Sequence, residues 1–505
     1  MTKKYFLTTT LPYVNAEPHI AHALEFVLAD AIVRFQRQKL GNKNVFFNVG
    51  TDEHGQKIWE KSFQEKLVIH DFTDKYVNRF VEFCKMFDVS YDFFYRTSKP
   101  YHYPVAQAFW NEALKSGDIY KKKYSGLYCV GCERFRTEKE LVDGNCPDHG
   151  VPPKIFEEEN YFFKLSKYRD LILKYLQETE FVIPEEARNF AIEFCKNDLE
   201  DISISRDKKN LTWGVPIPGD DTQVMYVWFD ALSNYIGSIT YQGDTSKPFT
   251  IEKAKAKMED WEMVQLCGSD NIRFQSIIWQ GMLQSCGLPF SKKLLVHAWI
   301  LGADGRKMSK TLGNTVSPFV EIEKYGKDAV RYFFLACMPT TGDAVYNSDE
   351  FKNVYNAALA DNFGNLLNRV IVLKAKLQDR LMKEIDDAKF KPELAIKYGV
   401  VLNPDLEFLN RVEELVNASK LNMEEYNVFE YCKSANEIGN LANQYMTKNA
   451  PWLKDCTNPA SVLSNVTYAL YKLIEIYSPI IPSSCEKAKN MLDNNEKGVL
   501  FEKLI

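Results

Sequence analysis

Apolar residues near the start of the chain change from the period of a strand to the period of a helix. Residues 5–10 form a short run of aromatic and β-branched side chains, which predicts a buried strand. After a loop, Pro18 is predicted to open a helix whose apolar residues recur every three or four positions as far as Gly41. His19 and His22 share the polar side of its first turn. These histidines indicate a phosphate site, because free N–H groups and the helix dipole attract anions at a helix start.

The alternation of strand and helix continues and places a second polar loop beside the first. A strand over 44–49 is followed by residues 50–55, which carry Asp52. Strand, helix and strand form a right-handed unit, so both loops reach the same edge of the sheet, where ligands bind in open α/β folds. Asp52 is therefore a candidate for holding a cationic group of a substrate, with a helix cap as the structural alternative. Taken alone, His19 and His22 could be surface residues at a helix start. Their place at this sheet edge favours a role as ligands.

Later segments extend the sheet and then give way to helices. Residues 70–118 are helical in pattern, with breaks at two prolines. Three more strands are predicted, over 223–231, 263–267 and 294–301, and each is followed by polar or glycine-rich residues. The first runs into a helix that carries Tyr235, and the second precedes a helix over 271–286. From about Ser348 onward the pattern is helical throughout, which predicts a bundle of about 150 residues as a separate domain.

Length and composition narrow the class of protein. A chain of 505 residues with 45% hydrophobic and 26% charged residues predicts three or more globular domains. The net charge of −5 argues against a non-specific DNA-binding protein, because nucleic acid would have to be bound by local basic patches. No apolar run is long enough to cross a bilayer, and no signal peptide is expected. Most of the eleven cysteines are scattered, which indicates reduced thiols in a soluble, cytoplasmic protein.

One set of cysteines is clustered. Cys129 and Cys132 are separated by two residues, and after thirteen intervening residues Cys146 and His149 repeat that spacing. Two such pairs match a tetrahedral zinc site with three cysteines and one histidine. Chance spacing in a loop is the alternative, but the set uses three of eleven cysteines and one of only seven histidines. Because no open position or general base accompanies the set, we expect a structural zinc ion rather than a catalytic one.

A loop after the last predicted strand carries two lysines. Lys307 and Lys310 flank Met308 and Ser309, and glycines precede them. A solvated basic loop is the alternative for so short a pattern. At a strand end on the same crevice as the histidines, however, the lysines can neutralise a triphosphate, and the glycines allow the loop to move over it.

Together, the histidine loop and the Lys-Met-Ser-Lys-Thr loop resemble the two signatures of class I aminoacyl-tRNA synthetases. Further stretches are similar to the methionyl-tRNA synthetase family within that class: residues 11–13, 50–55, 226–231, the single Cys₃His knuckle and 450–452. The resemblance spans nearly the whole chain. It implies an α/β fold in which a Rossmann-type parallel-sheet catalytic domain is split by a zinc-binding connective insert and followed by an all-α anticodon-binding bundle.

The resemblance implies domain limits and a reaction. We expect the two halves of the catalytic domain over 1–116 and 223–347, the second with the lysine loop and a stem-contact region, the insert over 117–222, and the bundle over 348–505. Methionine carboxylate would attack the α-phosphate of ATP, which binds with magnesium, and release pyrophosphate. The methionyl group would then pass to the 3′ end of tRNA(Met). Because no dimerisation domain is appended, a monomer is expected.

The resemblance also assigns roles to individual residues. The catalytic set is His19, His22, Lys307 and Lys310. The ATP-binding set is His19, His22, Gly268, Asp270 and Lys310. The methionine-binding set is Leu11, Tyr13, Asp52, Trp228, Ala231, Tyr235 and Gln275, with Asp52 holding the α-ammonium. The set that contacts the CAU anticodon is Asn365, Arg369 and Trp452, where the alternative for Trp452 is a core position.

Four positions depart from the family pattern. Ala21 replaces a glycine that lets adenine pack closely, Thr311 replaces a serine, and Ser269 replaces a lysine. Gln275 stands where the family has a histidine, and its amide could still donate toward a thioether without titrating near neutrality. A pocket reshaped for another amino acid and a solvent-facing glutamine are the alternatives for Gln275.

Several other functions fit parts of the pattern. Leucyl-, isoleucyl- and valyl-type synthetases share both signatures, but their large editing domain does not fit between residues 117 and 225. A cysteinyl-type enzyme would place zinc in the amino-acid pocket, and small nucleotidylyltransferases lack the bundle and the knuckle. A synthetase-like RNA-binding protein without activity would be expected to have lost the signature histidines or lysines.

Overall fold

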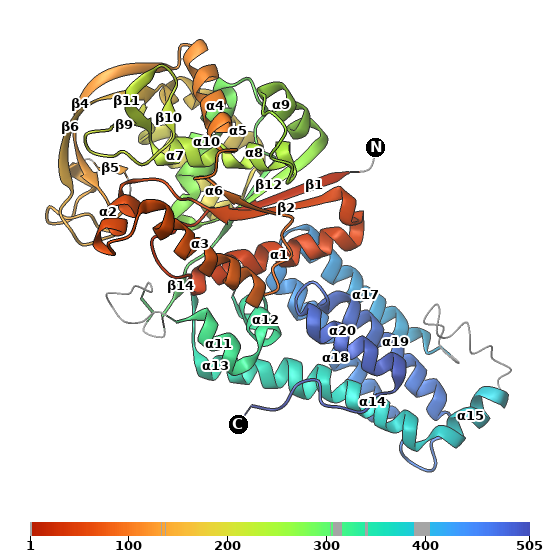
Figure 1. Ribbon diagram of the computed structural model, residues 1–505. Coiled ribbons are helices and arrows are strands. Elements are labelled where there is room, and N and C mark those ends of the chain that lie inside the picture. The colour runs from red at the N-terminus through yellow and green to blue at the C-terminus, as the bar shows by residue number, and fades with distance from the viewer. Residues whose placement is uncertain are drawn as a thin grey trace. The chain divides into compact units, whose positions relative to one another are not determined.

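A parallel β-sheet organises the N-terminal part of the computed structural model, which describes residues 3–132, 134–136, 138–302, 305–306, 316–338, 342–387 and 404–504 (Figure 1). The strands of this sheet run in the order β3 (Phe93–Arg96), β2 (Val45–Thr51), β1 (Lys4–Thr9), β12 (Trp261–Gly268), β13 (Lys293–His297) and β7 (Val182–Ile183). Every neighbouring pair in that order is parallel. The strands β1 and β2 are almost entirely buried, as expected where helices cover both faces of a parallel sheet.

The chain divides into two compact units. The first unit consists of Met1–Ala29, Gln36–Lys85 and Val89–His297, and the second of Asp30–Phe35, Met86–Asp88 and Ala298–Ile505. The helices that begin in the first unit are α1 (Ile20–Leu40), α2 (Gln56–Gln64), α3 (Ile69–Met86), α4 (Tyr103–Lys115), α5 (Arg169–Glu178), α6 (Glu185–Asn197), α7 (Val227–Leu232), α8 (Asn234–Tyr241), α9 (Ile251–Asp260) and α10 (Trp279–Ser285). A π-helical turn, Phe274–Ile278, precedes α10.

Two smaller sheets lie in the middle of the sequence. One is antiparallel and runs in the order β5 (Arg134–Arg136), β4 (Ile119–Cys129), β6 (Lys154–Phe163) and β8 (Ile202–Ser203). The other has the order β10 (Pro216–Ile217), β11 (Asp220–Met225) and β9 (Ser205–Asp207). The clustered cysteines lie around the end of β4, so the antiparallel sheet is the base on which the candidate metal site is built.

The second unit is mainly helical. A short parallel pair, β14 (Ile300–Leu301) and β15 (Ala344–Val345), lies within it. Its helices are α11 (Pro318–Tyr325), α12 (Lys327–Cys337), α13 (Ser348–Val354), α14 (Asn365–Lys376), α15 (Gln378–Asp387), α17 (Leu406–Glu424), α18 (Val428–Asn449), α19 (Pro459–Tyr477) and α20 (Pro482–Asn494), with a π-helical segment, Tyr355–Gly364, before α14. Apolar faces at helical spacing, such as that of α18, bury the bundle core. In the part of the chain that the structure describes, no helix is long and apolar enough to span a membrane.

Four expectations from the sequence are wrong in detail. The first helix begins at Ile20 with His19 as its N-cap, so Pro18 lies before it. Residues 70–118 contain a strand, β3, because a short aromatic run pairs with β2 there. Residues 223–231 are not a strand of the parallel sheet but the end of β11 followed by the buried helix α7. Residues 294–301 divide into β13 and β14, which belong to different sheets.

Candidate functional site

The paired histidines lie at the start of α1, directly after the loop that follows β1. Their rings are stacked with centroids 3.9 Å apart, and the backbone N–H of His19 donates to Nδ1 of His22 over 3.2 Å. Because Nδ1 of His22 accepts this bond, the proton of the neutral ring lies on Nε2. The His22 ring also packs edge-on against Phe80 at 5.3 Å. The arrangement places two imidazole rings beside the N–H groups of a helix start, which suits phosphate oxygens.

A carboxylate on α1 contacts one residue just after β1 and another at the end of β13. Glu25 accepts from the backbone N–H of Thr10 over 2.7 Å and lies 3.2 Å from Nε2 of His297, at the end of β13. Gly268 ends β12 beside His297, and a methyl group there would touch that ring at 3.4 Å. Asp270 follows in a short turn and is exposed. The predicted nucleotide residues of the first unit, His19, His22, Gly268 and Asp270, therefore follow adjacent strands at one sheet edge.

The loop after β2 is anchored by a buried ion pair that the sequence pattern did not indicate. Glu53 is fully buried, and Arg96 on β3 holds it through two hydrogen bonds of 2.7 and 2.8 Å. The hydroxyls of Thr51 and Ser98 donate to the same carboxylate. This bidentate pair fixes the backbone on either side of Glu53, and the neighbouring residue is Asp52.

Asp52 does not cap the helix that follows it. The helix that follows begins at Gln56 with Gly55 as its N-cap, so the capping alternative is wrong. The carboxylate is buried and receives long contacts from the backbone N–H of His54 at 3.4 Å and from the hydroxyl of Thr97 at 3.5 Å. A β-bridge also joins Asp52 to Tyr13. The loops after β1 and β2 therefore meet at the backbone of this residue.

Aromatic side chains gather next to Asp52. Tyr13 packs edge-on against Trp228 of α7 at 5.8 Å, and Trp228 stacks on Phe274 at 3.7 Å. Leu11 and Ala231 are buried, and Leu11 belongs to the same hydrophobic core as Tyr235. Phe274 was not singled out from the sequence, although it directly precedes Gln275. The set can enclose an apolar side chain beside a carboxylate.

Gln275 is buried and takes part in a polar chain. Only 1% of its surface is exposed, so the solvent-facing alternative is wrong. Its Nε2 donates to the hydroxyl of Tyr235, and its Oε1 accepts from Nε2 of Gln265 over 2.6 Å. Burial raises the pKa of Tyr235 above its ordinary value, so the hydroxyl keeps its proton.

A second buried cluster joins the Asp52 loop to α7. The carboxylate of Asp230 on α7 lies 3.2 Å from Nδ1 of His54 and 3.7 Å from Nε2 of His102. The other nitrogen of His102 pairs with the hydroxyl of Tyr95 at 3.0 Å. Burial acts to raise the pKa of Asp230, but the two histidines outweigh it and hold that pKa below its usual value. Burial lowers the pKa of His102, so this ring is neutral. No sequence pattern indicated this cluster, because its members lie far apart along the chain.

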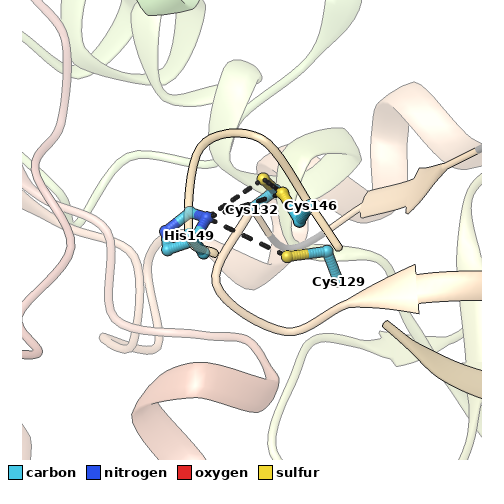
Figure 2. A group of neighbouring side chains, drawn as sticks. All are labelled: Cys129, Cys132, Cys146 and His149. Atoms are coloured by element: carbon cyan, nitrogen blue, oxygen red, sulfur yellow. Dashed lines mark hydrogen bonds between the residues drawn. The ribbon is translucent and has the colours of Figure 1, made fainter. Parts of the chain in front are cut away.

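The four predicted zinc ligands converge. Figure 2 shows the side chains of Cys129, Cys132, Cys146 and His149 pointing toward one another, and their ligand atoms all lie within 4.8 Å. Nδ1 of His149 lies 3.3 to 3.9 Å from the three sulfurs, and the sulfurs of Cys132 and Cys146 are 3.5 Å apart. A tetrahedral zinc ion would place sulfurs about 3.8 Å apart and sulfur and nitrogen about 3.5 Å apart. The donor set therefore fits zinc.

Protonation of the cysteines is consistent with a site that needs a cation. Burial is the main cause that raises the pKa of Cys129 to about 12. Without a cation this thiol would therefore keep its proton, whereas a bound metal ion stabilises the thiolate. Arg136 contacts the sulfur of Cys132 at 2.8 Å and the carboxylate of Asp148, which closes the outer side of the cluster.

In the second unit, an arginine and a tryptophan from the predicted anticodon set lie together. The guanidinium of Arg369 lies over the ring of Trp452 at 5.3 Å, and Nη1 of Arg369 donates to Oδ1 of Asn443 over 3.3 Å. Trp452 is 40% exposed, so the core alternative is wrong. A cavity of about 310 Å³ is lined by Asn368, Arg369, Val372, Leu373 and Trp452. Asn365 is exposed at the start of α14 and is not among the lining residues. Asn368 was missed, although it directly precedes Arg369.

Lys307, Lys310 and Thr311 lie outside the described residues.

The chain is similar to known proteins over almost its whole length. The family model described as tRNA synthetases class I (M) matches residues 5–152 and 149–371. The methionine–tRNA ligase of Caldanaerobacter subterraneus subsp. tengcongensis is 36% identical over 520 residues, which cover 100% of this chain and 76% of that protein. The chloroplastic/mitochondrial methionine–tRNA ligase of Arabidopsis thaliana is 39% identical over 451 residues, covering 89% of this chain and 70% of that protein. The structure of Mycobacterium tuberculosis methionyl-tRNA synthetase in complex with methionyl-adenylate has a TM-score of 0.85 at 30% identity, covering 97% of this chain and 94% of that one.

Proposed function

The chain belongs to the methionine family of class I tRNA synthetases, and from this premise we propose that it is an ATP-dependent methionine–tRNA ligase. It activates methionine with ATP to methionyl-adenylate and transfers the methionyl group to the 3′ end of tRNA(Met). One observation carries the proposal. The loops after the parallel strands β1, β2 and β12 reach one sheet edge. The first of these loops leads to the histidine pair, and through Tyr13 it also pairs with the loop of the buried Asp52.

In the proposed methionine site, Asp52 holds the α-ammonium group. Its buried carboxylate lies where the loops after β1 and β2 pair, and a carboxylate is the acceptor that suits an ammonium group. Hydrophobic and aromatic groups enclose the methionine side chain, with the amide of Gln275 beside them: Leu11, Tyr13, Trp228, Ala231 and Tyr235.

In the proposed nucleotide site, His19 and His22 contact the phosphates, and Gly268 and Asp270 contact the rest of ATP. Lys307 and Lys310 complete the set by neutralising the charge that shifts to pyrophosphate. ATP enters with magnesium. The step needs in-line placement and charge neutralisation rather than covalent catalysis by the protein.

The cysteine cluster is proposed to hold one structural zinc ion through Cys129, Cys132, Cys146 and His149. The ion would supply the charge that keeps the thiolates together and would order the turns at the end of β4. These residues act as ligands only and take no part in the reaction.

The anticodon is proposed to bind the second unit. The cavity beside Arg369 and Trp452 can take a flat unpaired base, which stacks on an aromatic ring and is read along its edge. Asn365 and Asn368 lie on the same helix and offer amide groups for that edge. The proposed domain limits remain 1–116 and 223–347 for the catalytic halves, 117–222 for the insert and 348–505 for the bundle, in a cytoplasmic monomer.

Methionine-dependent exchange of pyrophosphate into ATP tests the proposal. The assay is run with each of several amino acids and without tRNA. Exchange that is strongest with methionine supports the proposal. Stronger exchange with another amino acid would assign a different class I synthetase, and tRNA binding without any exchange would favour an RNA-binding protein.

A further inference from the structure

The peptide group between Glu53 and His54 lies directly after Asp52 and has a hydrogen bond at each end. Its carbonyl, on Glu53, accepts from the indole Nε1 of Trp213. Its N–H, on His54, donates to Oδ1 of Asp52 over 3.4 Å. A trans peptide group is planar, and its C=O and N–H point in opposite directions. The indole and the carboxylate therefore lie on opposite sides of this one peptide group.

The chemistry of the two groups fixes the direction of the indole bond. An indole N–H can only donate and a carbonyl oxygen can only accept, so Trp213 is the donor. If the peptide group turned over, its carbonyl oxygen would face the carboxylate of Asp52, which is also an acceptor. The bond from Trp213 therefore favours the orientation in which a peptide N–H faces Asp52.

The segment that carries Trp213 is held in place by contacts outside the Asp52 loop. It lies between β9 and β10, within the proposed insert. On one side, the backbone N–H of Leu211 donates to the carbonyl of Asp207 at the end of β9 over 3.0 Å. On the other side, the carbonyl of Val215 accepts from the backbone N–H of Met225 on β11 over 2.8 Å. The insert therefore sets the position of the indole.

Packing of the indole ring is separate from its hydrogen bond. Trp213 is only 9% exposed and forms a hydrophobic cluster with Leu211 and Val224. Its ring also packs edge-on against His54 and His70, with centroids 5.1 and 4.9 Å away. A phenyl ring at this position would keep much of the packing but would lack the N–H, so the two contributions can be tested separately.

We propose that Trp213 is a positioning residue for methionine binding: by holding the peptide group that follows Glu53, its indole N–H keeps the carboxylate of Asp52 in place for the α-ammonium group. The inference rests on the proposed function and deepens it, because it gives the insert a part in the amino-acid site. A peptide N–H that faces the carboxylate stabilises its charged form, which is the form that binds an ammonium group. The proposed ATP residues lie elsewhere, so ATP binding is independent of Trp213.

The variant Trp213→Phe tests this role, because it removes the N–H and keeps an aromatic ring. Pyrophosphate exchange gives kcat and the KM values for methionine and ATP. We expect the KM for methionine to rise by about 3–10-fold, the usual effect of losing one hydrogen bond, with kcat and the KM for ATP near their wild-type values. Methioninol has the ammonium group but no carboxylate, and its dissociation constant, measured by calorimetry, should rise by the same factor.

The variant Trp261→Phe is the matched control. Trp261 is also buried and lies at the start of β12, at the other end of the strand from Gly268. Among the described residues, its indole N–H has no hydrogen-bond partner. Its KM for methionine should therefore stay at the wild-type value.

Three results would overturn the inference while leaving methionine activation in place. The first is an unchanged KM for methionine in folded Trp213→Phe. The second is an equal rise in Trp261→Phe, because loss of ring volume would then explain the effect. The third is an equal rise in the KM for ATP, which a general loosening of the fold would cause. Absence of methionine-dependent exchange in the wild type would instead overturn the proposed function.

A tryptophan analogue covers the case in which Trp213→Phe does not fold. Benzothienylalanine, incorporated at position 213, keeps both fused rings and has sulfur in place of the N–H, so it fills the same space without a donor. The same rise in the KM for methionine supports the inference, and a wild-type KM overturns it.

Discussion

At the scale of single residues, Gly131 shows how the lack of a side chain shapes the candidate zinc site. Gly131 lies between the first two cysteines, and the ring of His149 packs directly on its backbone. A methyl group at this position would lie 2.6 Å from Cγ of His149, closer than real contacts allow. Nδ1 of His149 faces the sulfurs only because the other side of the ring can approach Gly131 so closely.

Gly131→Ala is therefore expected to displace His149 and weaken metal binding without removing any ligand. We expect zinc affinity to fall by about 10–100-fold, the usual effect of disturbing a residue that supports a ligand. Competition with a chromogenic chelator measures this. Val130→Ala, the adjacent change, should leave the affinity near the wild-type value. Equal affinity in Gly131→Ala and wild type would show that His149 is not a ligand.

At the scale of elements, Arg331 of α12 joins three segments of the second unit. Its guanidinium is fully buried, lies 2.8 Å from Asp30 of α1, and donates to the carbonyls of Phe87, Pro479 and Ile480. Because this buried guanidinium bonds to all of these groups, it holds the segments in one arrangement. Its removal would leave the buried partners unpaired, which lowers the free energy of unfolding.

Arg331→Met should destabilise the second unit by about 3–5 kcal/mol, because it leaves buried carbonyls and a carboxylate without their donor. Urea unfolding followed by circular dichroism measures the change. Lys327→Met is the control on the same helix, since its ion pair with Asp88 at 3.8 Å is exposed and should contribute less than about 1 kcal/mol. A similar loss of unfolding free energy in the two variants would contradict the expectation that burial makes the interactions of Arg331 the stronger ones.

The cluster of Asp230, His54 and His102 connects α7 with the loop of Asp52, and it predicts a dependence of stability on pH. The pKa of His102 is lowered in the folded protein, so the unfolded chain takes up a proton first as the pH falls below about 6.5. Stability should therefore decrease toward acid. Asp230, whose pKa is also lowered, adds to the loss below about pH 4, because the unfolded carboxyl is protonated first.

Urea unfolding between pH 8 and pH 5 tests the contribution of His102 to this pH dependence. His102→Gln should be less stable at pH 8 but should show a smaller slope of stability against pH. His70→Gln, which changes an exposed histidine outside the cluster, should keep the wild-type slope. A steeper slope in His102→Gln would show that the histidine is protonated in the fold.

At the scale of the whole molecule, the two proposed recognition events lie in separate compact units. The residues proposed for methionine activation that the structure describes belong to the first unit, and Arg369 and Trp452 belong to the second. Activation of methionine and recognition of tRNA should therefore respond separately to mutation.

Trp452→Ala should lower tRNA charging while leaving pyrophosphate exchange intact. Loss of one stacked base costs about 1–3 kcal/mol, so kcat/KM for tRNA should fall by roughly 5–150-fold. Aminoacylation and exchange are measured on the same preparation. Leu453→Ala, at an exposed neighbouring position, should affect neither assay. A parallel fall in both assays would mean that Trp452 supports the fold rather than the tRNA.

The sequence alone determined the features that depend on neighbouring residues. The periods of apolar residues placed β1, β2, β12 and α1 to within two residues, because strands and helices bury faces at fixed spacing. The pairing of Cys129 with Cys132 and of Cys146 with His149 was likewise visible as local spacing. The resemblance assigned Asp52 and Gln275 to one pocket. The lysine loop, also assigned in this way, lies outside the described residues.

The tertiary structure decided what depends on residues far apart in the chain. The run 226–231 is apolar except for Asp230, so no period distinguishes a strand from a buried helix, and packing made residues 227–231 part of α7. The short strand β3 exists because β2 offers an edge to pair with. The bonds of Gln265, Arg331 and Asp230 join elements that are distant in sequence, because a buried polar group must find a partner wherever the fold brings one.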